Sequence, residues 1–276
     1  MRVEFTKMHG LGNDFIVLDL PSDTAWPSTQ RWRALADRHT GIGFDQALVL
    51  LPPRRAGTDV FYRIVNADGT EVEQCGNGAR CIASLLHRRG VGGGRPVSMD
   101  SPAGVLQARF LDDGRVSVDM GAPNFEPRSL PFDAPTRLRA YRADVDGHTI
   151  EFGAVSMGNP HAVLQVPSVD SAAVERIGPS LQRSALFPRQ VNVGFMQIID
   201  KGHVRLRVYE RGAGETRACG TGACAAVVVG HDLDLLADDV EVHVPGGVLS
   251  VHWEGTGHPV WLTGPAQLSF EGSVEI

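Results

Sequence analysis

Alternating or β-rich runs of hydrophobic residues occupy most of the chain. FIVLDL, ALVLL, FYRIVN, VSMDS and VSVDMG fill the first part, and similar runs fill the second. Such runs of β-branched, aromatic and other apolar residues are typical of strands. Helical periodicity is confined to four stretches, residues 29–41, 77–90, 171–183 and 221–236. The pattern predicts an α+β protein in which strands predominate.

The sequence contains an internal repeat in three collinear blocks. VFYRIVNADGTEVEQCGNGARC (60–81) aligns without a gap to VRLRVYERGAGETRACGTGACA (204–225), which matches Cys75 with Cys219 and both glycines after each. In the same order, GNDFIVL resembles GNPHAVL, and GFDQA resembles GFMQI. Three similar blocks in one order predict two homologous domains rather than chance similarity of short loops.

The repeat and a break in composition together predict the domain boundaries. GAPNFEP, near residues 119–127, is a Gly/Pro-rich segment between the two copies. We expect one domain over residues 1–119, with the C-terminal segment 265–276 packing back on it, and a second over residues 120–264. Each is predicted to be a mixed β-sheet wrapped around a central helix, and the two to be related by a pseudo-twofold axis.

Composition narrows the class of function. With 276 residues, 42% of them hydrophobic, and a mean hydropathy of −0.08, the chain fits a globular protein of two domains. The N-terminus does not show a basic start followed by an apolar run, the pattern that indicates secretion, so a cytoplasmic location is expected. The net charge of −6 disfavours nucleic acid and anionic membranes as partners and favours a small molecule. Lys7 and Lys201 are the only lysines, which leaves few candidates for a pyridoxal Schiff base.

Two of the four cysteines stand where a predicted helix begins. Cys75 and Cys219 precede Gly-Asn-Gly and Gly-Thr-Gly, respectively. Free amides at a helix N-terminus bind anions, and the same field is expected to lower a thiol pKa from about 8.5 toward neutrality. A thiolate and a thiol on opposite faces of one carbon can remove and replace its proton. We therefore predict a cofactor-independent amino-acid racemase or epimerase in which these two cysteines face each other across the substrate.

Other interpretations of the cysteines have less support. Cys81 and Cys224 lie inside apolar helical stretches, where cysteine usually acts as a small hydrophobic residue. The spacings Cys-x5-Cys and Cys-x4-Cys are wider than most zinc knuckles, and the glycine loops lack the Lys-Ser/Thr ending of a phosphate-binding loop. We expect no metal. A thiol redox or metal-binding protein remains the alternative from another class.

The sequence closely resembles diaminopimelate epimerase. The resemblance rests on KMHGLGNDFIVLD, GIGFDQALVL, RIVNADGTEVEQCGNGARC, SMGNPHAV, VNVGF and YERGAGETRACGTGACAA, which span almost the whole chain in the family's order. It implies an isomerase of lysine and peptidoglycan precursor biosynthesis that interconverts LL- and meso-diaminopimelate. It also implies a homodimer that uses neither metal nor pyridoxal. A proline or hydroxyproline racemase is the alternative within enzymes.

The resemblance also implies roles for individual residues. Cys75 and Cys219 would be the two acid/base residues, and His161 and Glu210 would lie beside the reacting amino group. Polar side chains would hold the substrate, and they are those of Asn13, Gln46, Asn66, Asn159, Asn192, Glu210 and Arg211. Backbone amides at the two helix starts would also bind it, and they are those of Gly76, Asn77, Gly220 and Thr221. Arg211 suits a distal carboxylate, because guanidinium binds carboxylate in a bidentate manner.

Overall fold

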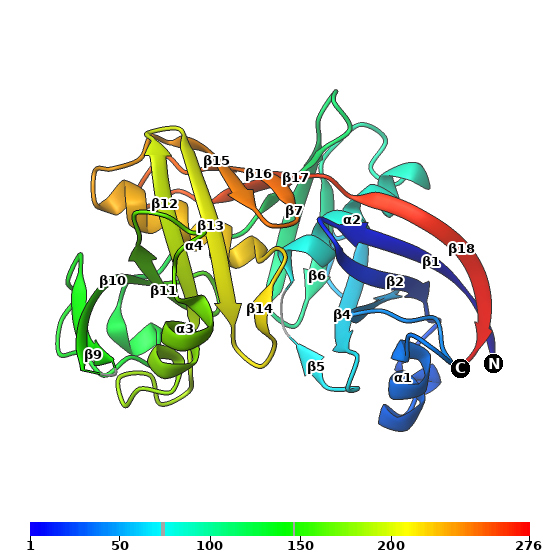
Figure 1. Cartoon of the computed structure of the whole chain (residues 1–276). Helices are drawn as coiled ribbons and strands as arrows, with labels where there is room; N and C mark the ends of the chain where they lie inside the picture. The colour runs from blue at the N-terminus through cyan, green and yellow to red at the C-terminus, as the bar shows by residue number, and fades with distance from the viewer. Residues whose placement is uncertain (73–74, 146) are drawn as a thin grey trace. The chain divides into compact units, whose positions relative to one another are not determined.

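The computed structural model describes residues 1–72, 75–145 and 147–276, and the chain divides into two compact units (Figure 1). Unit 1 consists of Met1–Asp119 and Gly264–Ile276, and unit 2 consists of Met120–Thr263. Glu73 and Gln74, which belong to the first copy of the repeat, lie outside the described residues.

Unit 1 is a mixed sheet with two α-helices. Its helical elements are η1 (Asp23–Ala25), α1 (Thr29–Ala36) and α2 (Gly76–Arg88). Its strands are β1 (Arg2–Gly10), β2 (Asn13–Asp19), β3 (Gln46–Leu51), β4 (Val60–Asn66), β5 (Glu71–Val72), β6 (Val97–Ser101), β7 (Gly104–Phe110), β8 (Val116–Asp119) and β18 (Gln267–Glu275). β18 pairs antiparallel with β1, β1 with β2, β3 with β4, β6 with β7 and β7 with β8. β2 is parallel to β3, and β4 to β6, and α1 and α2 lie on the crossovers that such parallel pairs require.

Unit 2 repeats this pairing strand by strand. Its helical elements are η2 (Pro127–Ser129), α3 (Val174–Gln182) and α4 (Gly220–Asp232). Its strands are β9 (Tyr141–Val145), β10 (His148–Ser156), β11 (Pro160–Gln165), β12 (Asn192–Asp200), β13 (His203–Glu210), β14 (Gly214–Thr216), β15 (Asp239–Val244), β16 (Gly247–His252) and β17 (Trp261–Gly264). β11 is parallel to β12 and β13 to β15, while β9–β10, β10–β11, β12–β13, β15–β16 and β16–β17 are antiparallel. β9 occupies the position in unit 2 that the C-terminal β18 occupies in unit 1.

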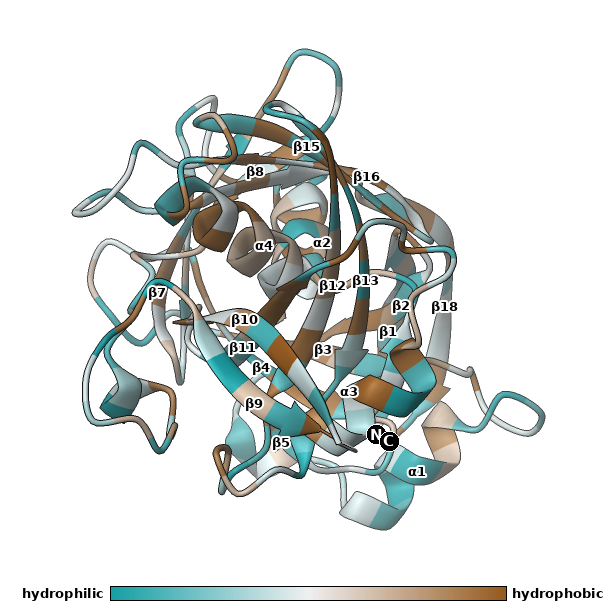
Figure 2. Cartoon of the chain, turned by 60° about the vertical axis from the view of Figure 1, so that its left-hand side comes forward, coloured by the Kyte–Doolittle hydropathy of each residue, from teal (hydrophilic) through white to brown (hydrophobic). Residues whose placement is uncertain are grey.

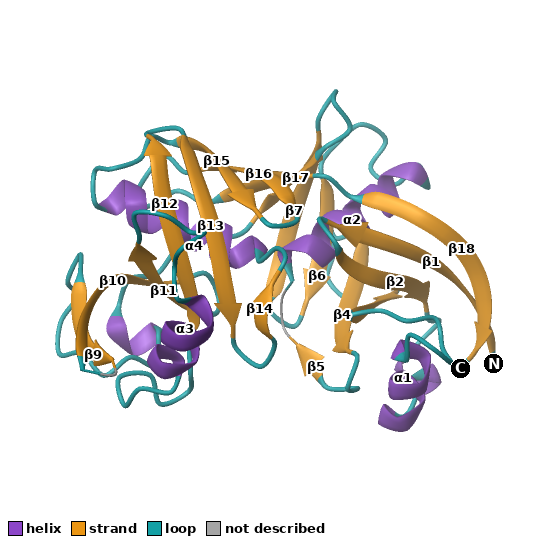
Figure 3. Cartoon of the chain, in the orientation of Figure 1, coloured by secondary structure: helices purple, strands orange, loops and turns teal. Residues whose placement is uncertain are grey.

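A central helix packs inside the sheet of each unit, as the sequence predicts (Figure 3). α2 contacts β1, β2, β6, β7 and β8, and α4 contacts β10, β11, β12, β13 and β16. α4 is buried from Gly220 through Gly230 and is coloured as hydrophobic along much of its length (Figure 2). A helix that is apolar on all sides is stable only when the protein surrounds it. These contacts confirm the predicted α+β fold with a mixed sheet around a helix.

The first predicted helix is too long at its C-terminal end. The pattern placed it over residues 29–41, but α1 ends at Ala36. Asp37 adopts an extended conformation, and its carboxylate accepts hydrogen bonds from the backbone amides of His39 and Thr40. This competition of an aspartate side chain with the helix is local, and hydrophobic periodicity does not report it.

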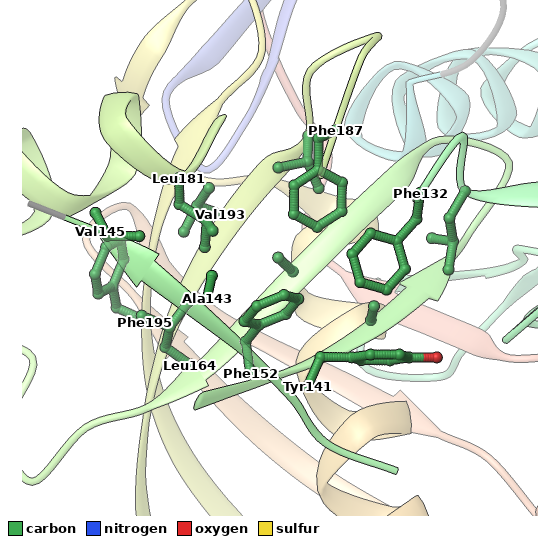
Figure 4. Packing of buried hydrophobic residues seen from close by; sticks show 14 of the residues in the cluster. Phe132, Tyr141, Ala143, Val145, Phe152, Leu164, Leu181, Phe187, Val193 and Phe195 are labelled. Atoms are coloured by element: carbon green, nitrogen blue, oxygen red, sulfur yellow. The ribbon is translucent and has the colours of Figure 1, made fainter. Parts of the chain in front are cut away.

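The core of unit 2 is rich in aromatic residues (Figure 4). The rings of Phe132 and Phe187 stack with their centroids 4.8 Å apart, and Tyr141 meets Phe132 edge to face at 4.6 Å. Aromatic pairs at these separations add stabilisation beyond the area they bury. In unit 1 a corresponding cluster of buried aliphatic and aromatic residues includes Leu18, Trp32 and Phe44. None of the helices in the described part of the chain is long and apolar enough to cross a membrane.

Candidate active site

In unit 1, Cys75 is the N-cap residue of α2. Its backbone is extended, and its Sγ accepts a hydrogen bond from the amide of Gly78 at 3.4 Å. A Cβ added at Gly78 would lie 2.9 Å from a methyl carbon of Leu48 in β3. The second glycine of the Cys-Gly-x-Gly motif therefore lets the first turn of the helix pack closely on a strand. Cys75 is half-buried.

Two asparagine side chains lie beside the Cys75 thiol. The Cys75 Sγ donates to Asn13 Oδ1 over 3.8 Å, and Asn77 Nδ2 donates to the same oxygen at 3.2 Å. Asn13 follows Gly12, whose φ of 88° belongs to the left-handed region that glycine adopts without strain. The turn between β1 and β2 thus aims Asn13 at the start of α2.

The other two predicted binding residues of unit 1 form a pair of their own. Gln46 and Asn66 are opposite each other on β3 and β4, and Gln46 Nε2 donates to Asn66 Oδ1 at 2.9 Å. Asn66 Nδ2 donates to Thr70 Oγ1 at 3.2 Å. The side-chain carbonyl oxygen of Gln46 is buried and, within the described ranges, has no hydrogen-bond partner. It is therefore a buried acceptor without a donor among the described residues, which is costly and uncommon in a folded protein.

In unit 2, Cys219 is the N-cap residue of α4 and is 4% exposed. Its Sγ donates to Glu210 Oε2 at 3.1 Å, and it lies 3.6 Å from Thr221 Oγ1. The hydroxyl of Thr216 donates a short hydrogen bond to the other oxygen of Glu210. The Glu210 carboxylate is thus held between the hydroxyl of Thr216 and the thiol of Cys219.

The predicted lowering of the thiol pKa is wrong for Cys219. Burial, together with the negative charge of Glu210, raises the pKa of Cys219 well above its usual value, although the Thr221 hydroxyl and the amide of Gly222 oppose the shift. Burial also raises the pKa of Glu210. A helix N-terminus carries only about half an elementary charge. Burial of the sulfur, together with the neighbouring Glu210 carboxylate, outweighs it, so the thiol form of Cys219 is favoured.

His161 is buried and uncharged, and Asn159 and Thr221 link it to this thiol. It is 1% exposed, and burial, with the positive charge of Arg211, lowers its pKa to about 3. Its Nε2 lies 3.0 Å from Asn159 Oδ1, and Asn159 Nδ2 donates to Thr221 Oγ1 at 3.2 Å. The network assigns the ring proton to Nε2, because the amide oxygen can only accept. Gly158, with a φ of 87°, gives Asn159 the same kind of turn that Gly12 gives Asn13.

Asn192 supports Arg211 through the backbone. Asn192 Oδ1 accepts from the amide of Arg211 at 2.8 Å, and Asn192 Nδ2 donates to the carbonyl of Pro160 at 3.2 Å. The guanidinium of Arg211 reaches the carbonyl of Arg189 at 3.4 Å, and the residue is exposed. Its side chain is therefore accessible to an anionic ligand.

Three residues next to these sites were missed by the sequence analysis. Thr216 contacts Glu210, Asp45 contacts Asn13, and Arg80 contacts Asn77. Of these three, Arg80 could have been recognised from the sequence, because it is a charged residue inside the apolar stretch that follows Cys75. Neither Thr216 nor Asp45 carries a pattern in the sequence that separates it from an ordinary surface residue.

The family model described as diaminopimelate epimerase matches residues 5–126 and 153–269 of the chain. A protein named diaminopimelate epimerase from Alkalilimnicola ehrlichii is 52% identical over 278 residues, and the match covers 100% of both chains. The chain belongs to the diaminopimelate epimerase family. A second protein of this name, from Ectopseudomonas mendocina, is 50% identical over 276 residues, again with 100% of both chains covered. Membership of the diaminopimelate epimerase family confirms the resemblance and the prediction of an isomerase.

Solved structures outside the diaminopimelate epimerase family share the fold. A hydroxyproline epimerase from Agrobacterium vitis has a TM-score of 0.71 at 17% identity, with 99% of this chain and 92% of that chain covered. A PhzF-family phenazine biosynthesis protein from Bacillus anthracis has a TM-score of 0.68 at 18% identity, with 100% of both chains covered. At these identities the likeness shows the fold alone, so it lends no support to a proline or hydroxyproline racemase. For the redox or metal-binding alternative, the described residues contain no cluster of His, Cys, Asp and Glu able to hold a metal ion.

Proposed function

We propose that this chain interconverts LL- and meso-2,6-diaminopimelate by moving the proton of one α-carbon. The observation that carries the proposal is the cysteine N-cap found in each unit, where a thiol stands next to the amides of a buried helix start. The two proteins named diaminopimelate epimerase that match along the whole chain support the choice of substrate. Diaminopimelate is a precursor of lysine and of peptidoglycan, and we propose a cytoplasmic location for the chain.

The proposed reaction uses Cys75 and Cys219 as acid and base. One sulfur, as thiolate, takes the proton from the α-carbon, and the carbon–hydrogen electron pair stays on the carbon. The other sulfur, as thiol, gives its proton to the opposite face, so the configuration inverts and one thiolate and one thiol remain. Amides of Gly76 and Asn77 in unit 1, and of Gly220 and Thr221 in unit 2, are proposed to bind the reacting carboxylate. Preorganised donors at that carboxylate stabilise the carbanion, and no cofactor is required.

In unit 2, Glu210 and His161 are proposed to set the state of Cys219. Glu210 accepts a hydrogen bond from the thiol at 3.1 Å, which holds the sulfur in one orientation, and burial together with the Glu210 charge keeps the thiol protonated in the free protein. His161 stays neutral because its pKa is lowered to about 3, so it interacts with the substrate ammonium or the carbanion as a hydrogen-bonding group rather than as a cation. In the free protein, Cys219 is thus the thiol that is ready to donate a proton, as the acid of the reaction.

The remaining polar residues are proposed to bind the two ends of the substrate. Diaminopimelate has a second carboxylate and ammonium, and the exposed guanidinium of Arg211 suits that carboxylate. The buried acceptor of Gln46 suits an ammonium. The asparagines add donors and acceptors without adding charge, and they are Asn13, Asn66, Asn159 and Asn192.

A homodimer is proposed to form along β18. This strand pairs with β1, yet most of its residues are exposed or half-exposed. Phe270 exposes 49% of its surface, and its ring meets Phe5 edge to face at 6.0 Å. Exposed aromatic groups on a long strand are typical of contact surfaces. Light scattering of the wild type and of Phe270→Glu tests this, since the variant should shift the population toward monomer.

Incubation with each diaminopimelate stereoisomer in heavy water tests the activity. The wild type should epimerise both and introduce deuterium at the α-carbon, in the presence of EDTA and without added pyridoxal phosphate. Cys75→Ala and Cys219→Ala should each lose epimerisation by about a thousandfold or more, the range of acid/base catalysis. Cys81→Ala and Cys224→Ala are matched controls in the same two helices and should stay active. Full activity in either of the first two variants, or turnover of L-proline or trans-4-hydroxy-L-proline instead, would overturn the proposal.

A further inference from the structure

Arg80 is a fully buried cation one turn into α2. Burying a charge is costly unless the surrounding groups compensate it, so a buried arginine in an apolar helix needs a reason. The gap-free alignment of the repeat places Cys224 at the corresponding position of α4. The charge is therefore a feature of unit 1 and not of the shared fold.

The guanidinium of Arg80 holds the first turn of α2. Its Nη2 donates to Asn77 Oδ1 at 2.7 Å, and its Nη1 lies 3.4 Å from the carbonyl oxygen of Gly76. A guanidinium can only donate, so the Asn77 amide must turn its oxygen toward Arg80. Its Nδ2 then faces the other way and donates to Asn13 Oδ1 at 3.2 Å.

Asn13 is fixed from its other end as well. Its Nδ2 donates to the carboxylate of Asp45 at 2.9 Å, and Asp45 in turn pairs with Arg38 at 2.9 Å. An amide side chain has nearly the same shape in its two flipped orientations, so its partners decide which atom points where. With Asp45 at the nitrogen and Asn77 at the oxygen, Asn13 presents its oxygen to the Cys75 sulfur, 3.8 Å away.

We propose that Arg80 is a positioning residue, which fixes the side-chain amide of Asn77 and through it the orientation of Asn13 beside Cys75. The proposal rests on the role assigned to Cys75 under the proposed function. Unit 2 has Thr221 where unit 1 has Asn77. A hydroxyl rotates to suit its neighbours and has no wrong flip to exclude, which agrees with the uncharged Cys224 at the position of Arg80.

A double-mutant cycle separates this role from a charge or packing effect. Arg80→Met should lower kcat/KM for diaminopimelate about 10- to 100-fold, because a small misplacement at an active site has an effect of this size. In the background of Asn77→Thr, the same substitution should change kcat/KM by less than about threefold, since the amide that Arg80 orients is absent. Cys224→Ala, at the matching position of α4, is the control and should remain within about threefold of wild type. An equal loss in both backgrounds would overturn the proposal.

A second readout does not depend on the reaction. In ¹⁵N spectra of the free protein, the side-chain amide signals of Asn77 and Asn13 should shift in Arg80→Met and lose protection against hydrogen exchange. Unchanged signals would overturn the proposal even if activity fell, whereas a wild type that fails to epimerise diaminopimelate would refute the proposed function and leave this result standing. If Arg80→Met does not fold, Arg80→Lys keeps the buried cation but not the planar donor pair. It should show a smaller loss that also disappears in the Asn77→Thr background.

Discussion

The helix starts of the two units have the same sequence pattern but surround their cysteines with different charges. Both cysteines are N-caps of helices of 13 residues, and both are followed by Gly-x-Gly. Cys219 donates to a half-buried carboxylate, Glu210, and is itself 4% exposed. Cys75 is half-buried and its thiol donates to Asn13, which is linked through Asn77 to the cation of Arg80. Duplication supplies the N-cap geometry twice, and in unit 2 burial together with the Glu210 carboxylate raises the pKa of Cys219.

The alignment of the repeat identifies where this difference arises. Glu210 corresponds to Asn66, Arg80 to Cys224 and His161 to Phe15. The exchanges at Glu210 and His161 add an ionisable group to unit 2, and the exchange at Arg80 adds a buried cation to unit 1. A racemase whose two substrates are mirror images can treat them alike and needs no such asymmetry. LL- and meso-diaminopimelate are not mirror images, because they differ at only one of two stereocentres. The asymmetry is therefore the part of the molecule that mutations can best probe.

Glu210→Gln should have the largest effect, because it removes the carboxylate that separates the two thiol environments. We expect kcat/KM to fall at least about 100-fold, as for the loss of an acid/base partner. We also expect alkylation of Cys219 by iodoacetamide to begin at a lower pH, since burial still raises its pKa but the added effect of the Glu210 charge is gone. Glu215→Gln is the control, because Glu215 pairs with Arg207 and not with Cys219. A Cys219 alkylation profile that does not move would show that burial alone controls the thiol.

His161→Phe should sharpen the comparison by giving unit 2 the residue of unit 1. The unfolded chain protonates His161 below its usual pKa of 6.5, while the folded chain resists protonation down to about 3. Protonation of His161 therefore does not affect the stability of the wild type above pH 6.5, and the wild type loses stability as the pH falls from 6.5 toward 3. The free energy of unfolding of the phenylalanine variant, relative to that of the wild type, should therefore be about 2 kcal/mol higher at pH 5 than at pH 8. Urea unfolding at both pH values measures this, and a difference that is the same at pH 5 and pH 8 would contradict a buried neutral histidine.

Much of this arrangement was predictable from the sequence, because it depends on local patterns. Alternating hydrophobic residues predict strands, and the glycines after Cys75 and Cys219 mark the helix starts. The state of Cys219 was not predictable, since it depends on a carboxylate from β13 that the fold buries against the sulfur. The role of Arg80 was equally hidden, because a side chain's hydrogen bonds to Asn77 and onward to Asn13 follow from packing and not from spacing.

The smallest effect that we predict is a difference in reactivity between the two thiols of the wild type. At pH 8, with no substrate, iodoacetamide should modify Cys75 about tenfold or more faster than Cys219, because alkylation needs an accessible thiolate. Cys219 is 4% exposed and hydrogen-bonded to Glu210, whereas Cys75 is half-buried and its thiol donates to the amide oxygen of Asn13. Peptide mapping by mass spectrometry assigns the label, and the fully buried Cys81 and Cys224 serve as internal references that should react slowest. Equal rates at Cys75 and Cys219 would mean that the Glu210 carboxylate does not distinguish the two helix starts in solution, and the assignment of Cys219 as the resting acid would have to be abandoned.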